Sequence, residues 1–359
     1  MHNVVIKENE IVFVCDQSGD VSPQAEGGLG LYFRDTRFLS ELGLEVNGAR
    51  PLLLSSSGEQ TFLSNLQCAN PDWVLPDGTS IPPQTISIRR DRLVEGGLHE
   101  RIGLFNYTQR SVPIEIRLSF RADFRDIFDI RQFGGEVKRG HFQTPELSDS
   151  GLDLSYLGLD RVRRRTEIRF EPAPDELIPS VAVAPGVGLS PAESYLTSSV
   201  SGDEDRGPGG IAIFRVLLQS QESSTITFRV IPVVGDEQPY IASFETVAHT
   251  VQSSYQRWEA DSTLIETSNS TFNRLLRRSQ LDLRALLVRR ETGLYPDAGI
   301  PWFAVPFGRD GLITAYQALL LSPEIAVGTL RYLAHHQGQR VDPWRDEQPG
   351  KILHEMRFG

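Results

Sequence analysis

Cysteine is scarce in this sequence, since only Cys15 and Cys68 occur among 359 residues. Two cysteines are too few for a disulfide framework. Cys15 lies in an apolar, strand-like run, which favours a small buried hydrophobic side chain. The sequence also has no cysteine and histidine cluster with zinc-binding spacing, and no glycine-rich loop of the kind that binds phosphate. The residue types therefore do not indicate a metal site.

Positive charge is also in deficit, with 36 Lys and Arg against 47 Asp and Glu, which gives a net charge of -11. This balance argues against nucleic acid or an anionic membrane as the main partner. There is no apolar run of membrane-spanning length and no cationic, apolar leader. We therefore expect a cytoplasmic protein. A neutral ligand such as a carbohydrate is compatible with this charge balance, although the balance does not imply one.

The first two thirds of the chain show the period-two pattern of β-strands. Two hairpins are predicted, one around Glu8-Asn9-Glu10 and one around Glu95-Gly96-Gly97, where glycine supplies the positive φ of the turn. Further strands are predicted at residues 113–120, 165–170, 211–218 and 224–234. Many short strands at this spacing indicate a large antiparallel β-sandwich over residues 1–240. Residues 134–155 and 196–210, rich in Gly, Ser, Asp and Glu, are predicted to be exposed loops.

Helical periodicity begins after Pro239. A linker helix is predicted within residues 241–264, at about 244–258, and a stronger helix over 271–290. The apolar face of the second comprises Phe272, Leu275, Leu276, Leu283, Leu286 and Leu287. A third helix is predicted over 311–321, and a fourth from Ser322 as N-cap to His336. Residues 340–359 are predicted to be a polar loop. The chain therefore changes from strands to helices near residues 240–265.

The candidate ligand-binding loop is Gly299–Gly311, which delivers Arg309-Asp310 to the start of a predicted helix. Arginine offers a planar fork of donors and aspartate accepts hydrogen bonds, so the pair can engage neighbouring sugar hydroxyls. Trp302, Phe303 and Phe307 supply surfaces on which a sugar ring can stack. The alternative is that Asp310 caps the helix and Arg309 is its salt-bridge partner. The residues alone leave both interpretations open.

Other polar groups of residues have more ordinary interpretations. His354-Glu355 could act as acid and base or bind hydroxyls, but its spacing favours an exposed polar loop. His335-His336 are interpreted as surface residues favoured by the helix dipole. The runs Ala122–Arg131 and Arg161–Arg165 are interpreted as edges with ion pairs.

Four segments, in order, resemble bacterial glycogen-debranching-type enzymes of the amylo-α-1,6-glucosidase family. Leu31–Ser40 (LYFRDTRFLS) and Ala122–Phe128 (ADFRDIF) resemble two hallmarks of its N-terminal sandwich. Gly299–Asp310 and Pro349–Arg357 (PGKILHEMR) resemble the opening of its helical catalytic domain. The resemblance covers essentially the whole chain.

The resemblance implies a sandwich followed by an (α/α)6 toroid related to glucoamylase. It implies hydrolysis of α-1,6 or related α-glucosidic bonds in glycogen-like glucans or oligosaccharides, without metal or organic cofactor. Arg309 and Asp310 would then bind the sugar beside the scissile bond, and Trp302 and Phe303 would shape that pocket. His354 and Glu355 would bind substrate from an adjacent loop. Inversion of the anomeric centre is a further expectation.

The sequence departs from the family pattern in the length of the helical part. Six helical hairpins need far more helices than residues 265–359 can hold, so we expect an incomplete toroid. We expect the catalytic carboxylates beyond residue 359, an exposed apolar patch on the helices, and no activity from this chain alone. The competing hypotheses are a non-catalytic carbohydrate-binding protein and a purely structural sandwich. The preferred linkage, any transferase activity and the oligomeric state are not predicted.

Overall fold

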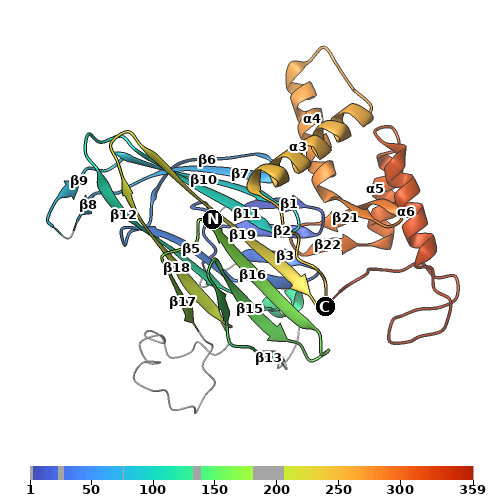
Figure 1. The fold of residues 1–359 in the computed structure, drawn as a ribbon. Helices are drawn as coiled ribbons and strands as arrows, with labels where there is room; N and C mark the ends of the chain where they lie inside the picture. The colour runs from blue at the N-terminus through green and yellow to red at the C-terminus, as the bar shows by residue number, and fades with distance from the viewer. Residues whose placement is uncertain (1–2, 23–27, 76, 132–138, 181–205, 359) are drawn as a thin grey trace.

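The computed structural model describes residues 3–22, 28–75, 77–131, 139–180 and 206–358. Figure 1 shows two regions, a large body of β-sheets and a smaller region that contains the longer helices. The chain crosses from the first region to the second after residue 234 and returns to the sandwich at its C-terminus. Both regions therefore come together near the end of the chain.

A nine-stranded antiparallel sheet forms one layer of the sandwich. Its strand order is β13 (His141–Phe142), β15 (Gly151–Leu157), β16 (Arg163–Glu171), β19 (Ser223–Val234), β11 (Leu98–Asn106), β10 (Ile86–Val94), β7 (Leu63–Ala69) and β6 (Leu52–Gln60), with β14 (Glu146–Ser148) beside β15.

Two four-stranded sheets pack against this layer. One has the order β17 (Glu176–Ser180), β18 (Gly209–Leu218), β12 (Val112–Arg121) and β5 (Glu41–Val46). The other has the order β1 (Val4–Glu8), β2 (Ile11–Cys15), β3 (Gly30–Phe33) and β4 (Thr36–Leu39). A small hairpin consists of β8 (Trp73–Val74) and β9 (Ser80–Ile81).

Aromatic side chains join the layers of the sandwich. The ring of Phe120 on β12 lies 5.4 Å from that of Phe228 and 5.6 Å from that of Phe170, both on the large sheet. Phe170 in turn lies 5.7 Å from Phe214 on β18. All four rings are buried, and inward positions along β12 alternate strictly with outward ones. The alternation in the sequence therefore places one face of each strand in the core.

The predicted hairpins and strands are confirmed, with one correction. Residues 4–8 pair with 11–15, and 86–94 pair with 98–106 around Gly96, whose φ is +62°. Cys15 is buried, as expected. The predicted exposed loop 134–155 is wrong where β13, β14 and the first five residues of β15 form, although residues 146–149 are exposed as expected. Residues 132–138 and 181–205 lie outside the described residues, which leaves most of the predicted loop 196–210 untested.

The helices largely follow the sequence pattern, but their ends differ. In the described part of the chain they are α1 (Ile127–Ile130), α3 (Phe244–Asp261), α4 (Ser270–Leu286), α5 (Gly308–Gln317) and α6 (Pro323–His335). The helix predicted over 271–290 ends at Leu286, because Leu287 and Val288 enter a buried strand. That strand is β20 (Leu287–Arg290), which pairs with β21 (Gly293–Gly299), and β21 pairs with β22 (Phe303–Pro306). The predicted loop 299–311 is thus mostly β22 and the start of α5, which begins three residues before the predicted Gly311.

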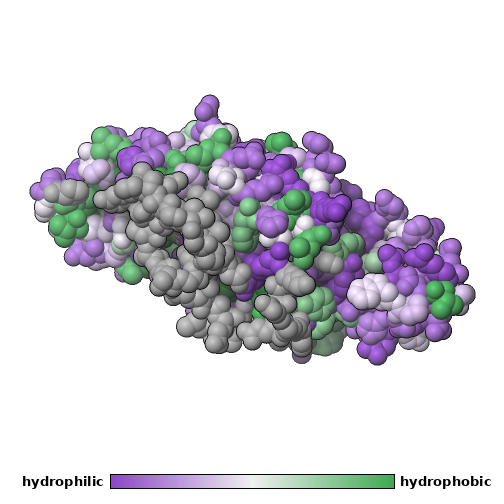
Figure 2. Space-filling view, turned by 90° about the horizontal axis from the view of Figure 1, so that it is seen from below, coloured by the Kyte–Doolittle hydropathy of each residue, from purple (hydrophilic) through white to green (hydrophobic). Residues whose placement is uncertain are grey.

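Several apolar side chains on α4, α5 and α6 are exposed, as expected from the sequence, whereas α3 buries its apolar face. Phe272 and Leu275 on α4 are 47% and 59% exposed, and Tyr316 on α5 is 76% exposed. Leu330 on α6 is also exposed. Figure 2 shows the molecule from below, and on that face the end formed by the helical region is mostly hydrophilic. The exposed apolar side chains are therefore not spread evenly over the helical region.

A buried ion pair joins the tip of the first hairpin to the helical region. Lys7 Nζ lies 3.2 Å from Asp297 Oδ2, and neither side chain is exposed to solvent. Arg290 Nη2 lies 3.3 Å from the other oxygen of Asp297. Lys7 also donates to the carbonyl oxygen of Ala285, at 3.0 Å. Burial lowers the pKa of Lys7 and raises the pKa of Asp297, so their attraction only partly offsets the cost of removing both charges from water.

The neighbouring residues of this hairpin also form ion pairs with the helical region. Glu8 accepts a hydrogen bond of 2.6 Å from Arg284 on α4, and Glu10 lies 3.2 Å from Arg290 on β20. Asn9, with a φ of +48°, lies at the turn between them. The hairpin tip therefore fixes the helical region against the sandwich through several charged groups at once.

We expect Asp297→Ala to lower the free energy of unfolding by about 3–5 kcal/mol, because it leaves Lys7 buried without its carboxylate. Urea denaturation of the purified variant measures this change. The control is Glu115→Ala, which breaks the solvent-accessible ion pairs with Arg117 and Arg215 and should cost about 1 kcal/mol or less.

A double variant, Lys7→Met with Asp297→Leu, removes both buried charges and should recover most of the lost stability. If the double variant were as unstable as Asp297→Ala, the uncompensated charge of Lys7 would not be the cause.

Candidate functional site

The two hallmark segments of the sandwich lie side by side. Arg37 Nε donates to Asp123 Oδ1 at 3.1 Å, and the same guanidinium makes a second contact with the other carboxylate oxygen. The backbone of Thr36 pairs with that of Asp126. Asp126 also accepts from Phe128 N at 2.7 Å and so caps α1. The interpretation of residues 122–131 as an edge with ion pairs is confirmed for the ion pair of Asp123 only, because the segment packs into the core and its second half forms α1. Arg164 and Arg165 likewise pair with Asp160 and Glu167.

Asp35, in the first hallmark, binds the C-terminal segment of the chain. Its Oδ1 accepts from Arg357 Nη1 at 2.9 Å, and its Oδ2 accepts from Phe358 N at 3.0 Å. Asp35 is buried and has a φ of +63°, in the left-handed region. Arg357 Nη1 also donates to the carbonyl oxygen of Trp302, at 3.3 Å. Asp35 and Arg357 therefore connect the sandwich, the C-terminal segment and the candidate loop.

The C-terminal segment also pairs with the candidate loop through the backbone. Gly308 N donates to His354 O, and Met356 N donates to Pro306 O, both at 3.0 Å. A β-bridge joins Phe307 to Glu355. Two segments that are separated in the sequence thus lie together, and they carry all six predicted site residues.

Arg309 and Asp310 lie in the first turn of α5, whose N-cap is Phe307. The side chain of Phe307 makes no capping hydrogen bond, and Asp310 is the third residue of the helix. The side chains of Arg309 and Asp310 form no hydrogen bond or ion pair with any residue that the structure describes. The interpretation of Asp310 as a helix cap paired with Arg309 is therefore wrong. Arg309 is exposed and Asp310 half-buried, so both can reach a ligand.

Two glycines on either side of this pair allow close packing. A Cβ at Gly308 would clash with the carbonyl oxygen of Leu353, and a Cβ at Gly311 would clash with the ring of Tyr295. The Tyr295 hydroxyl donates to Phe307 O at 2.8 Å. Burial raises the pKa of Tyr295, which keeps this hydroxyl protonated as a donor. The Gly-Arg-Asp-Gly sequence thus positions the start of α5 against both β21 and the C-terminal segment.

The aromatic residues of the loop have different environments. Trp302 is half-buried and packs edge-on against Tyr32 of the sandwich, with ring centroids 6.1 Å apart. Phe303 is 42% exposed, and its ring lies 5.9 Å from that of Phe307. The guanidinium of Arg131 lies over the rings of both Trp302 and Phe303, at 5.9 and 5.3 Å. Phe303 is therefore available to a ligand, whereas Trp302 mainly supports the loop.

His354 and Glu355 are both close to the loop, but their side chains differ in exposure and in ion pairing. The exposed ring of His354 lies 5.9 Å from that of Phe307. Glu355 forms an ion pair with Arg357 at 2.8 Å. Neither is simply part of a solvated loop, because their backbone is bridged to Phe307 and Gly308. The site thus combines a donor fork, a carboxylate, an exposed aromatic ring and an imidazole.

The sequence analysis assigned no role to Asp35 or Arg357. Both lie within quoted segments, and Asp35 follows an arginine as Asp310 does. No local signal could have shown that residues 322 positions apart make contact.

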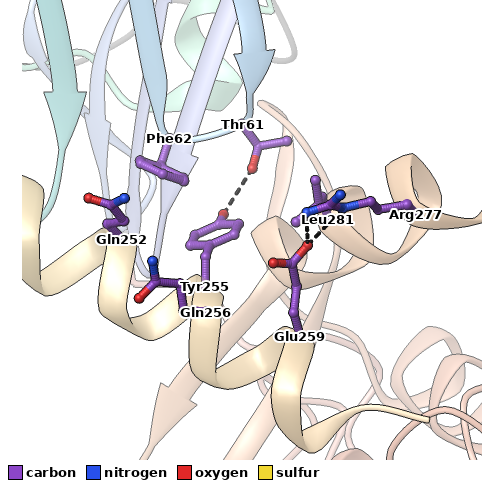
Figure 3. A pocket seen from close by; sticks show the side chains of 8 residues that line it. All are labelled: Thr61, Phe62, Gln252, Tyr255, Gln256, Glu259, Arg277 and Leu281. Carbon is purple, nitrogen blue, oxygen red and sulfur yellow. Dashed lines mark hydrogen bonds and ion pairs between the residues drawn. The ribbon is translucent and has the colours of Figure 1, made fainter. Parts of the chain in front are cut away.

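Two pockets border both α3 and α4 and lie away from these residues. One, of about 190 Å³, is formed by the β6–β7 turn, α3 and α4, and Figure 3 shows Tyr255 bonded to Thr61 on its wall. The other is a larger cleft of about 540 Å³. Neither is lined by any of the six predicted site residues. Among the described residues there is no group of His, Cys, Asp and Glu suited to a metal ion, and no helix there is long and apolar enough to span a membrane.

Comparison with known families identifies the sandwich. The N-terminal domain of (some) glycogen debranching enzymes matches residues 6–229, well over half of the chain. The chain belongs to this debranching-enzyme family. The match contains Asp35 and both hallmark segments. Comparison with curated protein sequences gives no significant match.

Solved structures extend the likeness of this debranching-enzyme chain to its helical region. A protein from the human microbiome described as a kojibiose phosphorylase matches 92% of the chain with a TM-score of 0.61 and 10% identity. A bacterial glucoamylase in complex with acarbose matches 91% with a TM-score of 0.51 and 11% identity. The chain spans about half the length of each, 46% and 48%. At this identity the likeness concerns the fold alone.

We expect Asp35→Ala to release the C-terminal segment of this debranching-enzyme chain without unfolding the sandwich. Hydrogen exchange followed by mass spectrometry should show faster exchange in residues 354–358, because Phe358 N loses its acceptor and Arg357 loses one of its two carboxylate partners. The matched control is Asp149→Ala, at an exposed turn, which should leave this exchange unchanged. Equal protection of the segment in both variants would contradict the role given to Asp35.

Proposed function

We propose that this chain is the sugar-binding N-terminal portion of a cytoplasmic glycogen-debranching-type α-glucosidase. Its substrates would be α-1,6 or related α-glucosidic bonds in glycogen-like glucans or oligosaccharides. The observation that carries the proposal is the unpaired Arg309-Asp310 dipeptide, which follows Phe307 by one residue, and the ring of Phe307 lies 5.9 Å from that of the exposed Phe303. Most other carboxylates around this site are already paired, so these two charges are the ones left for a ligand.

The chemistry of the pair suits a neutral sugar. The guanidinium can donate two parallel hydrogen bonds, and the carboxylate can accept from two hydroxyls. Together the two side chains carry no net charge, which suits a ligand without charge. Phe303 offers a face for the C–H groups of a pyranose, and His354 can bond a further hydroxyl. We propose that these groups form the subsite beside the scissile bond.

Hydrolysis requires a second set of groups. Glycosidases use two carboxyl groups placed across the scissile bond, one as general acid. We assign no such pair among the residues described here. The exposed apolar faces of α4, α5 and α6 are suited to packing against further helices of an (α/α)6 toroid. We propose that such helices supply the catalytic carboxylates and complete the pocket.

A non-catalytic carbohydrate-binding protein is the second candidate. The same observation favours it, because the groups of the site bind hydroxyls without needing a catalytic pair. The two proposals differ in whether the chain requires further helices to act.

We expect Arg309→Ala and Asp310→Asn to weaken binding of the 359-residue chain to maltooligosaccharides by about tenfold or more, since each loses hydrogen bonds from a charged group. Isothermal titration calorimetry measures the change. The matched controls are Arg50→Ala and Asp149→Asn, exposed sandwich positions that should bind like the parent chain. If the site variants bound as tightly as the controls, the pair would not be the sugar subsite.

We also expect the 359-residue chain alone to release no glucose from a branched dextrin, because the acid and base would lie on helices it does not contain. A glucose-oxidase assay on the purified chain measures this. Turnover that survived purification and fell with Asp310→Asn would show instead that the described residues contain the catalytic groups.

A further inference from the structure

The larger cleft lies between the sandwich and the helical region, away from the candidate sugar subsite. It has a volume of about 540 Å³ and is walled by α3, the β20–β21 turn and α6, with the tip of the first hairpin at one side. This volume is within the range typical of small-molecule sites. None of the six candidate residues lines it, so any ligand here would bind independently.

Three arginines from three different elements line the cleft without internal partners. They are Arg257 on α3, Arg289 on β20 and Arg331 on α6. All three are exposed, and within the described chain their side chains form no hydrogen bond or ion pair. A guanidinium only donates hydrogen bonds, so these groups can offer donors to a ligand that carries acceptors.

The cleft also contains buried oxygen atoms that lack donors. Glu8 gives one carboxylate oxygen to Arg284, but its Oε2 is buried and has no partner among the described residues. The hydroxyl of Thr292 is buried and unpartnered in the same sense. Buried polar atoms are usually hydrogen-bonded, so these two indicate an absent hydrogen-bond partner.

We propose that this cleft is a second carbohydrate site that binds an uncharged polyhydroxylated ligand, of the class of a glucan oligosaccharide. Hydroxyl groups both donate and accept, so one such ligand can serve the arginines and the buried oxygens together. An anion supplies only acceptors and meets the charge of Glu8, and an organic cation supplies only donors and meets the arginines.

The charges that line the cleft support the same ligand class, because they balance. Four acidic and four basic side chains line it: Glu8, Glu95, Asp261 and Glu324, and Arg257, Arg284, Arg289 and Arg331. The half-exposed Val327 on α6 and the ring of Trp258 on α3 add apolar surface. A binding site for an isolated charge would have an excess of the opposite sign.

A second site has a physical use on a branched polymer. Two sites on one rigid body bind two branches of the same glucan, so the second contact is intramolecular and overall affinity rises without new chemistry. This use rests on the proposed function for the choice of glucan as ligand. The cleft itself does not depend on Arg309 and Asp310, and different variants test the two sites.

The test is isothermal titration of the 359-residue chain with maltotetraose, sodium pyrophosphate and putrescine. It is performed in the Asp310→Asn background, which removes the candidate subsite. Arg257→Ala and Arg331→Ala are added singly, and Arg50→Ala is the control. Because all three arginines are exposed, the variants should fold, which thermal unfolding verifies.

We expect maltotetraose to bind the Asp310→Asn chain at one site and to bind about tenfold more weakly after either cleft substitution, with no change from Arg50→Ala. Absence of maltotetraose binding, or binding unaffected by both cleft substitutions, would overturn the proposal. Tighter binding of pyrophosphate or putrescine in the same cleft would overturn the ligand class. If Asp310→Asn removed one maltotetraose site from the parent chain while the cleft still bound maltotetraose, the two sites would be distinguished. The outcome for the cleft would then be separate from the outcome for the proposed function.

Discussion

The placement of the helical region depends on the buried contact between Lys7 and Asp297. Both side chains are fully removed from solvent, and a carbonyl and Arg290 complete their surroundings. Such a pair contributes little net stability, because desolvation opposes the attraction. The pair instead favours one arrangement of the two regions, since any other docking of the hairpin would leave one charge buried alone. The first hairpin of the sandwich thereby determines where β20 to β22, and with them the candidate loop, can lie.

The candidate subsite is built by both regions of the molecule. The helical region supplies Arg309 and Asp310, and the sandwich supplies Asp35, which holds the C-terminal segment against the loop. Four segments that resemble one enzyme family therefore meet in a single place. Their meeting gives a physical reason for the resemblance, because each segment positions another. The sandwich is in this sense a part of the site as well as a neighbouring domain.

The differences between prediction and structure have specific causes. Residues 151–155 were predicted to be a loop because of their glycine, serine and aspartate content, yet they belong to β15, a strand between β13 and β16, where ladder pairing outweighs weak propensity. The helix of residues 271–290 was predicted too long, because Leu287 and Val288 fit either pattern until pairing with β21 buries them. The N-cap interpretation of Asp310 failed for a similar reason, because α5 begins earlier, at Gly308, beside the backbone of His354.

The sequence by itself determined the strands of the sandwich, the change to helices after Pro239, and the residue types of the candidate sugar-binding loop. These features depend on local periodicity, which can be read from the sequence directly. Only the tertiary structure decided that Asp35 meets Arg357, that Lys7 meets Asp297, and that Arg309 and Asp310 stay unpaired. Such contacts join residues hundreds of positions apart, and whether a charge finds a partner depends on everything packed around it. The function proposed for the loop rests on this second set of facts.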